Sequence, residues 1–560
     1  MLYIMVDMHI VENKSKSGKK IYRSILLRES YREEGKVRKR TIANLSNCAP
    51  QEIEAIRLAL SHKEDLSALG ALSESVELQE GLSVGAVWSV YQVAKELGIE
   101  EALGKDFEGK LALWQVMARV IDQGSRLSAV RLAQVHAAGD VLDMKHGFDE
   151  NNLYDNLLWL SENQAKIERK LFKLRRGGKK PKLFLYNVTS SYLEGEMNHF
   201  GEYGYNRDGK KGKKQIVIGM LCDESGEPVS TEVFSGNTQD TKTFESQARK
   251  VLERFGCAEV TIVGDRGMIK TMQIERLPEG FHYITAITKP QIEALIKKGI
   301  LQLGLFEEKL CEIKDGGIRY ILRRNPTRME EMAKTRISKL QSMERYIERK
   351  NGYLREHPRA SVAKALDAAK ERLKKLKHET WVQIKDEAGT LKIERDEEAV
   401  KEESYLDGCY AIKTDLKENE ADTYLVHDRY KDLSEVEKVF RECKTVNLEV
   451  RPVYVRKEES TRGHVFVVML AYMVIRRLRD AWAGFDLTVE EGLKQLATIC
   501  SMEVKVKGQN ARCQKIPRPR QQSRELLEAL QIKLPEVLPC RNIRVVTRKK
   551  LPVRRKNQQI

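Results

Sequence analysis

Short apolar runs typical of β-strands recur between residues 183 and 414, and one long charged stretch interrupts them. The runs are residues 183–188, 215–222, 229–234, 260–263, 283–287 and 408–414. An amphipathic helical pattern precedes the fourth run, and strands that alternate with helices predict an α/β fold with a mixed sheet. These runs can share one sheet only if the chain leaves it near residue 290 and returns to it by residue 408.

The interrupting stretch, 290–405, has the character of an insertion domain. Two highly charged segments, 329–354 and 360–377, show helical periodicity, and His357 and Pro358 separate them. A proline between two helical patterns favours a turn. We therefore predict an antiparallel helical hairpin. Strand-like pieces accompany it at 318–322, 381–384 and 390–393.

The segments that flank the strand pattern differ from it in periodicity. Between residues 82 and 174, apolar side chains recur at intervals of three and four, as at Leu111, Trp114 and Met117, which predicts packed helices. Two further helices are expected at 429–446 and 463–478. The predicted domains are a small basic α+β module (1–75), a helical bundle (76–178), the first part of the α/β core (179–289), the insertion domain (290–405), the second part of the core (406–480), and a C-terminal helical region with a basic tail (481–560).

The excess of positive charge lies mostly at the C-terminal end. The chain has 99 Lys and Arg against 82 Asp and Glu, a formal net charge of +17, and residues 503–560 hold 16 of the cations and 4 of the acids. That segment therefore carries +12 and the other 502 residues carry +5. Such a segment is suited to salt-sensitive binding of a polyanion, although a disordered solubilising end is the alternative. Its cations include Arg541, Arg544, Arg548, Lys549, Lys550, Arg554, Arg555 and Lys556.

Cysteine usage and hydropathy bear on the cellular compartment. The nine cysteines are scattered and form no Cys-x-x-Cys pair, as expected of reduced thiols in a cytosol. The longest apolar stretch, 465–475, has 11 residues, whereas a membrane span needs about 20. No charged-then-apolar leader opens the sequence. A soluble cytoplasmic protein with no membrane partner is therefore expected.

Several common catalytic motifs are absent from the sequence. Residues 204–211 approach the Gly-x4-Gly-Lys-Ser/Thr phosphate loop, but Lys211 replaces the hydroxyl that binds magnesium and Asp208 adds a negative charge. No His-Glu-x-x-His or Cys/His spacing supports a zinc site. No Gly-x-Ser-x-Gly elbow supports a serine nucleophile. These absences disfavour nucleotide, zinc and serine hydrolase chemistry.

Two carboxylates remain as candidates for chemistry. Asp265 follows the apolar strand 260–263, which places it at the end of a strand where α/β sheets bind ligands; a strand-end turn or helix N-cap is the alternative. Glu437 lies on a helix with a buried apolar stripe. At about 100° per residue, Tyr430, Arg441 and Lys444 fall within about 60° of Glu437, beside that stripe. A solvated helix with local ion pairs is the alternative.

Motifs in a fixed order over residues 180–480 resemble the DDE transposases of bacterial insertion sequences. They are 185–192 (Leu-Tyr-Asn-Val-Thr-Ser-Ser-Tyr), 204–209, 215–219, 234–240 and 263–267, followed by the helix of Glu437. The spacing of Tyr430, Glu437 and Lys444 fits the Tyr-x2-Arg-x3-Glu-x6-Lys signature of the insertion-sequence-four-like branch, with Leu433 where arginine is expected. The resemblance implies a ribonuclease-H-like α/β core with an insertion domain, an N-terminal α+β and helical DNA-binding region, and a basic C-terminal region.

The resemblance also implies a site with two magnesium ions, for which manganese can substitute. Three carboxylates hold the metals in that family, and two-metal sites ready the attacking oxygen and stabilise the leaving oxygen of a phosphodiester. By resemblance Asp265 is the second ligand and Glu437 the third. The first falls on Asn187, whose amide offers a neutral oxygen in place of a carboxylate. We therefore expect Asn187, Asp265 and Glu437 to form a catalytic metal site of reduced activity.

The resemblance further implies contacts with transposon-end double-stranded DNA and with target DNA. Tyr430 and Lys444 are expected to contact the transposon-end strand and Arg441 to hold a phosphate, and the bundle at 76–178 is expected to bind DNA ends. A basic turn beside the site, with Arg266, could add contacts, although a solvated loop is the alternative. The cations of that turn are Arg207, Lys210, Lys211, Lys213 and Lys214.

The function predicted from these residues is cut-and-paste DNA transposition by a homodimer on DNA, in the cytoplasm and associated with the nucleoid. The asparagine at 187 favours a second hypothesis, a non-catalytic transposon-end DNA-binding protein or repressor. A third is a related ribonuclease-H-like nuclease without strand transfer.

Overall fold

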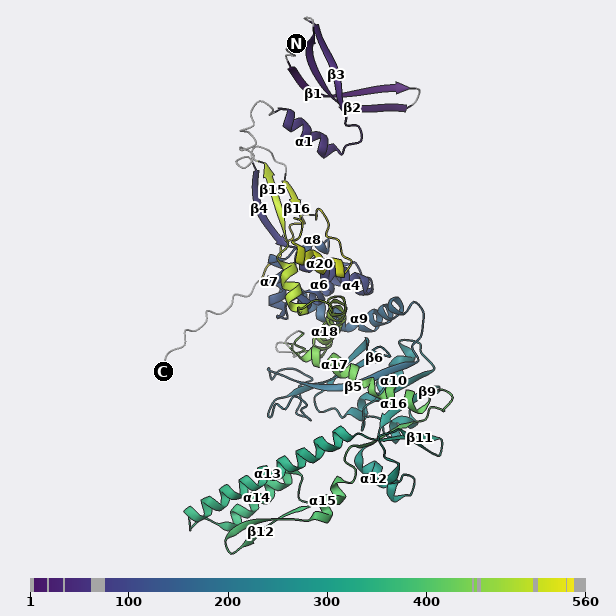
Figure 1. Cartoon of the computed structure of the whole chain (residues 1–560), viewed down its shortest axis with the longest axis vertical. Helices are drawn as coiled ribbons and strands as arrows, with labels where there is room; N and C mark the ends of the chain where they lie inside the picture. Colours follow the sequence, from purple (N-terminus) through teal and green to yellow (C-terminus); the bar gives the residue numbers. More distant parts are fainter. Residues whose placement is uncertain are drawn as a thin grey trace. The chain divides into compact units, whose positions relative to one another are not determined.

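The computed structural model describes residues 5–17, 20–33, 36–61, 76–445, 448–450, 455–506, 512–539 and 541–547 (Figure 1). They form two compact units. The first comprises Met1–Gly81, Cys500–Pro517 and Pro535–Leu538, and the second comprises Leu82–Ile499, Arg518–Leu534 and Pro539–Ile560. Of the predicted basic tail, Arg541 and Arg544 are described and the cations from 548 onward lie outside the described residues.

The first unit contains two small sheets. β1 (Met5–Ser17), β2 (Lys20–Glu33) and β3 (Lys36–Asn44) form an antiparallel sheet, followed by α1 (Pro50–Ser61). Strand β3 carries four cations of the predicted basic α+β module, Lys36, Arg38, Lys39 and Arg40. Ile25, Leu45 and Ile53 form the core of this sheet and helix.

The second small sheet corrects the expectation of an all-helical region after residue 481. β15 (Cys500–Val506) lies between β16 (Arg512–Lys515) and β4 (Val76–Ser83). The run Cys-Ser-Met-Glu-Val-Lys-Val alternates apolar and polar side chains with the period of two that strands require. Helices α19 (Val489–Ala497) and α20 (Gln521–Ala529) flank these strands in the sequence, as expected of a helical pattern.

The second unit begins with packed helices. They are α4 (Gly85–Glu96), α5 (Ile99–Leu103), α6 (Phe107–Ile121), α7 (Arg126–Val135), α8 (Ala138–Val141) and α9 (Glu150–Arg176). The apolar stretch 465–475 lies in α18 (Glu458–Ala481), which packs against α6 and α9 and is buried along most of its length. The stretch is thus a core helix, and no helix within the described ranges is long and apolar enough to cross a membrane.

Gly463 allows α18 to approach α9 closely. A Cβ atom at this position would lie 2.1 Å from the carbonyl oxygen of Leu157. We expect Gly463→Ala to lower the free energy of unfolding by about 1–3 kcal/mol, because the helices must separate. Thermal unfolding of the full chain measures the effect. Gly484→Ala is the matched control, since its Cβ would meet no atom within 4 Å, and an equal loss in both variants would contradict the explanation.

The central sheet of the second unit has the strand order β10-β11-β14-β9-β8-β5-β6-β7. β5 pairs in parallel with β8 and β8 with β9, and the other pairings are antiparallel, so the predicted mixed sheet is confirmed. The strands are β5 (Leu183–Tyr192), β6 (Gln215–Asp223), β7 (Pro228–Ser235), β8 (Val260–Gly264), β9 (Phe281–Ala286), β10 (Cys311–Asp315), β11 (Ile318–Arg324) and β14 (Cys409–Thr414).

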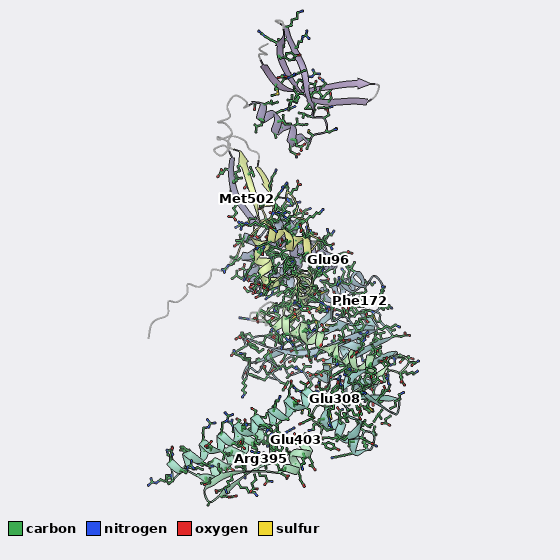
Figure 2. All side chains as sticks on the ribbon, in the orientation of Figure 1. Glu96, Phe172, Glu308, Arg395, Glu403 and Met502 are labelled. Carbon is green, nitrogen blue, oxygen red and sulfur yellow. The ribbon has the colours of Figure 1, made fainter. Side chains whose placement is uncertain are left out.

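The interruption at 290–405 differs from the prediction at its start. After α12 (Lys289–Lys297), β11 pairs with β14 and β10 pairs with β11, so both strands extend the central sheet. The part with a core of its own comprises α13 (Pro326–Glu356), α14 (Val362–Leu376), β12 (Val382–Glu387) and β13 (Thr390–Arg395). Arg395 of β13, labelled in Figure 2, forms an ion pair with Glu344 of α13. β11 and β14 exchange hydrogen bonds on either side of this insertion, so they hold its two ends together.

Candidate active site

Alternation along β5 assigns its side chains to opposite faces of the sheet. Phe184, Tyr186 and Val188 belong to a core cluster that includes Phe244 of α10 (Asp240–Glu253). Because successive side chains of a strand point to opposite faces, Asn187 lies on the other face. That face is covered by α17 (Leu433–Lys444), which packs against β5.

The parallel pairing of β5 and β8 places Asn187 beside Asp265. Tyr186 is the register partner of Gly264. The residues that follow them, Asn187 and Asp265, therefore lie side by side at the point where β8 ends. Asp265 is half-buried, and its Oδ1 accepts a hydrogen bond from the backbone N–H of Arg266 at 2.7 Å. Asn187 is 9% exposed, and its Oδ1 accepts the N–H of Val188 at 2.8 Å. The single side-chain oxygen of Asn187 and one of the two carboxylate oxygens of Asp265 therefore accept hydrogen bonds from the backbone of the next residue.

Glu437 reaches the site from α17. The helix buries Leu433, Val436 and Phe440 on one side, which leaves Glu437 exposed beside them. The single helix predicted at 429–446 is wrong, because the chain forms α16 (Thr423–Lys431) and then α17, with Asp432 between them. The turn at Asp432 sets Tyr430 and Glu437 on different helices.

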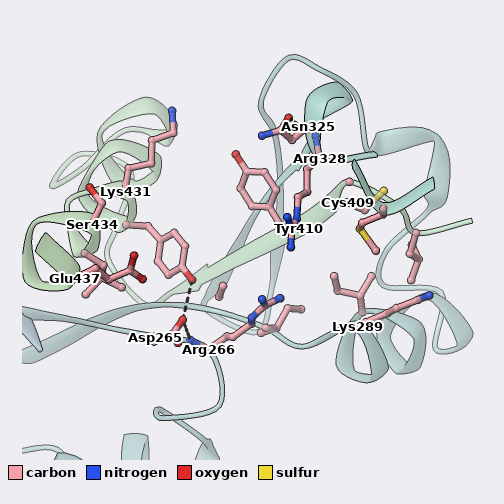
Figure 3. Close-up of a pocket in the computed structure, with 18 of the residues that line it drawn as sticks. Asp265, Arg266, Lys289, Asn325, Arg328, Cys409, Tyr410, Lys431, Ser434 and Glu437 are labelled. Atoms are coloured by element: carbon pink, nitrogen blue, oxygen red, sulfur yellow. Dashed lines mark hydrogen bonds between the residues drawn. The ribbon is translucent and has the colours of Figure 1, made fainter. Parts of the chain in front are cut away.

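Tyr430 nevertheless contacts the carboxylate of Asp265. Its hydroxyl donates a hydrogen bond of 3.5 Å to Asp265 Oδ1 (Figure 3). Burial, together with the neighbouring charge of Asp265, raises the pKa of Tyr430 well above its ordinary value. Tyr430 is therefore a neutral donor that orients the carboxylate.

Two cavities meet at Asn187, Asp265 and Glu437. The first, here called the insertion-side cavity, has a volume of about 550 Å³ and also contains Tyr430 and Arg266 (Figure 3). The second, the turn-side cavity, has a volume of about 320 Å³. Its further lining includes Arg207, Arg441 and Lys444. The structure thus brings together eight of the predicted site residues: Asn187, Arg207, Asp265, Arg266, Tyr430, Glu437, Arg441 and Lys444.

The remaining cations of the basic turn lie apart from the carboxylates. Lys210, Lys211, Lys213 and Lys214 line neither cavity. Lys213 pairs with Glu194 at 3.5 Å, and the Lys210 ammonium lies 5.8 Å from the centre of the Tyr192 ring. These contacts tie the two lysines to residues around the end of β5, away from the carboxylates.

Asp208 is a residue of the site that sequence reasoning did not identify. One of its oxygens accepts a hydrogen bond from Lys444 Nζ at 2.8 Å, and the other accepts the N–H of Tyr192 at 3.1 Å. A second ion pair joins Arg207 to Asp240 at 2.6 Å. In the sequence, Asp208 stood within the motif at 204–209 and as a charge unsuited to a phosphate loop, and its pairing with Lys444 could not be seen because the two residues lie 236 positions apart.

The donor set suits a hard divalent cation incompletely. Asp265 and Glu437 supply carboxylate oxygens, the ligands that magnesium prefers. Asn187 supplies a neutral amide oxygen that is already hydrogen-bonded to Val188. Among the residues that the structure describes, no group of three His, Cys, Asp or Glu side chains could hold a metal ion. The site is therefore one carboxylate short of a triad.

Cations of the insertion-side cavity were also missed. Lys289 begins α12, Arg328 lies in the first turn of α13, and Lys431 ends α16. These residues are far apart in the sequence and belong to no shared motif, so nothing in the sequence marked them as a group.

A mixed sheet with a carboxylate at the end of one strand, an amide on the adjacent parallel strand and a second carboxylate on a covering helix is an arrangement related to that of metal-dependent phosphodiester chemistry. Family comparisons give the particular family. Residues 174–474 match the transposase DDE domain, and residues 8–73 match the N-terminal domain of IS1634 family transposases. The first match covers more than half of the chain, which therefore belongs to the DDE transposases.

This membership confirms the expectation of an insertion-sequence DDE transposase. Domains of this family generally use divalent metal ions, and transposases bind transposon-end DNA. No curated protein matches the chain. Among solved structures, the cryo-EM structure of a piggyBac transposase synaptic complex with hairpin DNA is 10% identical with a TM-score of 0.33, and the match covers 69% of each chain.

Proposed function

We propose that this chain is a cut-and-paste DNA transposase whose catalytic step is impaired by Asn187. The observation that carries the proposal is the meeting of Asn187, Asp265 and Glu437 where two cation-lined cavities join. Asp265 and Glu437 would hold magnesium, or manganese in its place, with Asn187 as a weak neutral ligand. Two bound ions would supply activation of the attacking oxygen and stabilisation of the leaving oxygen.

The other side chains would position the DNA strand. Tyr430 fixes the orientation of the Asp265 carboxylate by its hydrogen bond. Arg441 and Lys444, on the turn side of Glu437, would hold backbone phosphates, and Arg207 and Arg266 would add positive charge around the scissile group. The DNA partners would be the transposon end and then the target, bound by a homodimer.

A second candidate is a transposon-end DNA-binding protein or repressor without catalysis, which Asn187 specifically favours. In that case the cation-lined cavities would bind DNA and the two carboxylates would be too few for turnover. A nuclease without strand transfer is a third candidate.

A joining assay separates the three candidates. A terminal-repeat duplex from the ends of the element is incubated with Mg²⁺, a supercoiled target plasmid, and either the native chain or Asn187→Asp. Products joined to the plasmid with Asn187→Asp support the transposase. Cleavage without joining selects the nuclease, and specific binding with no cleavage by either chain selects the repressor.

Lys444 offers a test of the DNA contact. The plot of log K against log salt has a negative slope, and removal of one phosphate contact makes this slope shallower by about 0.9. It also weakens binding about fivefold near physiological salt. We therefore expect Lys444→Gln to bind the terminal-repeat duplex about fivefold or more weakly, since Asp208 also loses its counter-charge. Fluorescence anisotropy across a salt series measures both quantities. Lys438→Gln, at an exposed position on the same helix, is the control. Equal losses of affinity in the two variants would show that Lys444 does not contact the DNA.

A further inference from the structure

The wall of the insertion-side cavity beyond the carboxylates is cationic. Arg266, Lys289, Arg328 and Lys431 line it, and its acidic residues are the two carboxylates already assigned to the metal site, Asp265 and Glu437. In Figure 3 Arg266 and Arg328 point into the space across from Glu437, whereas the ammonium groups of Lys289 and Lys431 point away from it. These four cations therefore lie in the cavity that does not contain Arg441 and Lys444.

Fold stability accounts for only one of these cations, because Lys289 Nζ donates a hydrogen bond of 2.8 Å to the backbone carbonyl of Glu403. Lys289 and Arg328 occupy the first turns of α12 and α13, where a positive charge is unfavourable against the helix dipole. Arg328 makes an exposed ion pair with Glu331 at 2.8 Å, a type of pair worth about 0–1 kcal/mol. Within the described part of the chain, Arg266 and Lys431 form no ion pair. An anionic ligand would explain the group.

The size of the cavity suits part of one strand. Its volume of about 550 Å³ falls in the range of about 300–1,000 Å³ that is typical of small-molecule sites. Tyr410, Ile292 and Met332 give it apolar walls, which suit sugar and base surfaces but not a solvated duplex backbone. A strand that enters the cavity would therefore be unpaired there.

We propose that the insertion-side cavity binds the backbone of a single, unpaired DNA strand on the side of the scissile phosphate away from Arg441 and Lys444. Arg328 and Lys431 are its phosphate-positioning residues, so the base of the insertion takes part in holding the substrate. The inference rests on the proposed function, because it takes Asp265 and Glu437 to mark the scissile phosphate.

The inference predicts a preference for unpaired flanks. The native chain should bind a terminal-repeat duplex with a three-nucleotide single-stranded extension past the cleavage position more tightly than the blunt duplex. Extensions of both polarities are tested, since only one can enter the cavity. Arg328→Gln with Lys431→Gln should remove about two single-strand phosphate contacts. The negative slope of log K against log salt should become shallower by about 1.4, and the affinity for the extended duplex should fall about tenfold.

The control is Arg345→Gln with Lys374→Gln, which removes the same charges from exposed positions of α13 and α14 that do not line the cavity. It should keep the preference for the extended duplex. The inference is overturned if the native chain binds blunt and extended duplexes equally, or if both double variants lose affinity alike. Specific binding of the blunt duplex, together with cleavage by Asn187→Asp, would leave the proposed function standing in either case.

Discussion

Asn187→Asp is expected to raise the rate of metal-dependent cleavage of a terminal-repeat duplex by about 100-fold or more. The estimate follows from the loss that accompanies changes outside the first ligand shell of metal sites, about 10–100-fold; a ligand itself should matter at least as much. Position 187 lies beside Asp265 on the neighbouring parallel strand and opposite α17. A carboxylate there would complete a triad and neutralise one further charge of the bound metals.

Single-turnover cleavage in Mg²⁺ measures the ratio of the two rates, and EDTA should abolish both. Asn151→Asp, which adds the same charge at an exposed position of α9, should cleave like the native chain. Equal rates for the native chain and Asn187→Asp would show that residue 187 is not a metal ligand.

Glu437→Gln, introduced into the Asn187→Asp chain, is expected to return cleavage to the native level, again a loss of about 100-fold or more. The substitution keeps the shape of the side chain but removes the charge that a hard cation requires. Glu437 lines both cavities together with Asp265, so its loss should impair catalysis and leave end binding largely intact.

Glu435→Gln in the same background is the matched control. Glu435 lies on α17 but pairs with Lys438 at 2.5 Å and lines neither cavity. We expect the cleavage rate of this variant to stay within about twofold of its parent, as is usual for surface changes. A comparable loss in both variants would indicate damage to α17 and not removal of a ligand.

The strands and the apolar core helix were readable from the sequence because burial imposes a simple period. Every residue of β5 and β6 is buried, which produces the near-continuous apolar runs that marked them. The end of such a run also located Asp265. The stripe of Leu433, Val436 and Phe440 likewise located the edge of α17 that carries Glu437.

Features that depend on long-range pairing could not be read in this way. β11 joins the central sheet by pairing with β14, β10 follows by pairing with β11, and β15 pairs with β4 from the other end of the chain. The break at Asp432 was hidden because Tyr430 and Glu437 fit one continuous helical stripe as well as two helices. The pairing of Lys444 with Asp208 and the cations of the insertion-side cavity depend on the same tertiary contacts.

The most direct test of the account is the position of the cut made by the Asn187→Asp chain on a terminal-repeat duplex in Mg²⁺. We predict a new 3′-hydroxyl at the last nucleotide of the element, formed faster than by the native chain and lost when Glu437→Gln is added. Cleavage scattered along the duplex, or no cleavage by the Asn187→Asp chain under conditions where it binds the terminal repeat, would contradict the assignment of Asn187, Asp265 and Glu437 as the catalytic metal site.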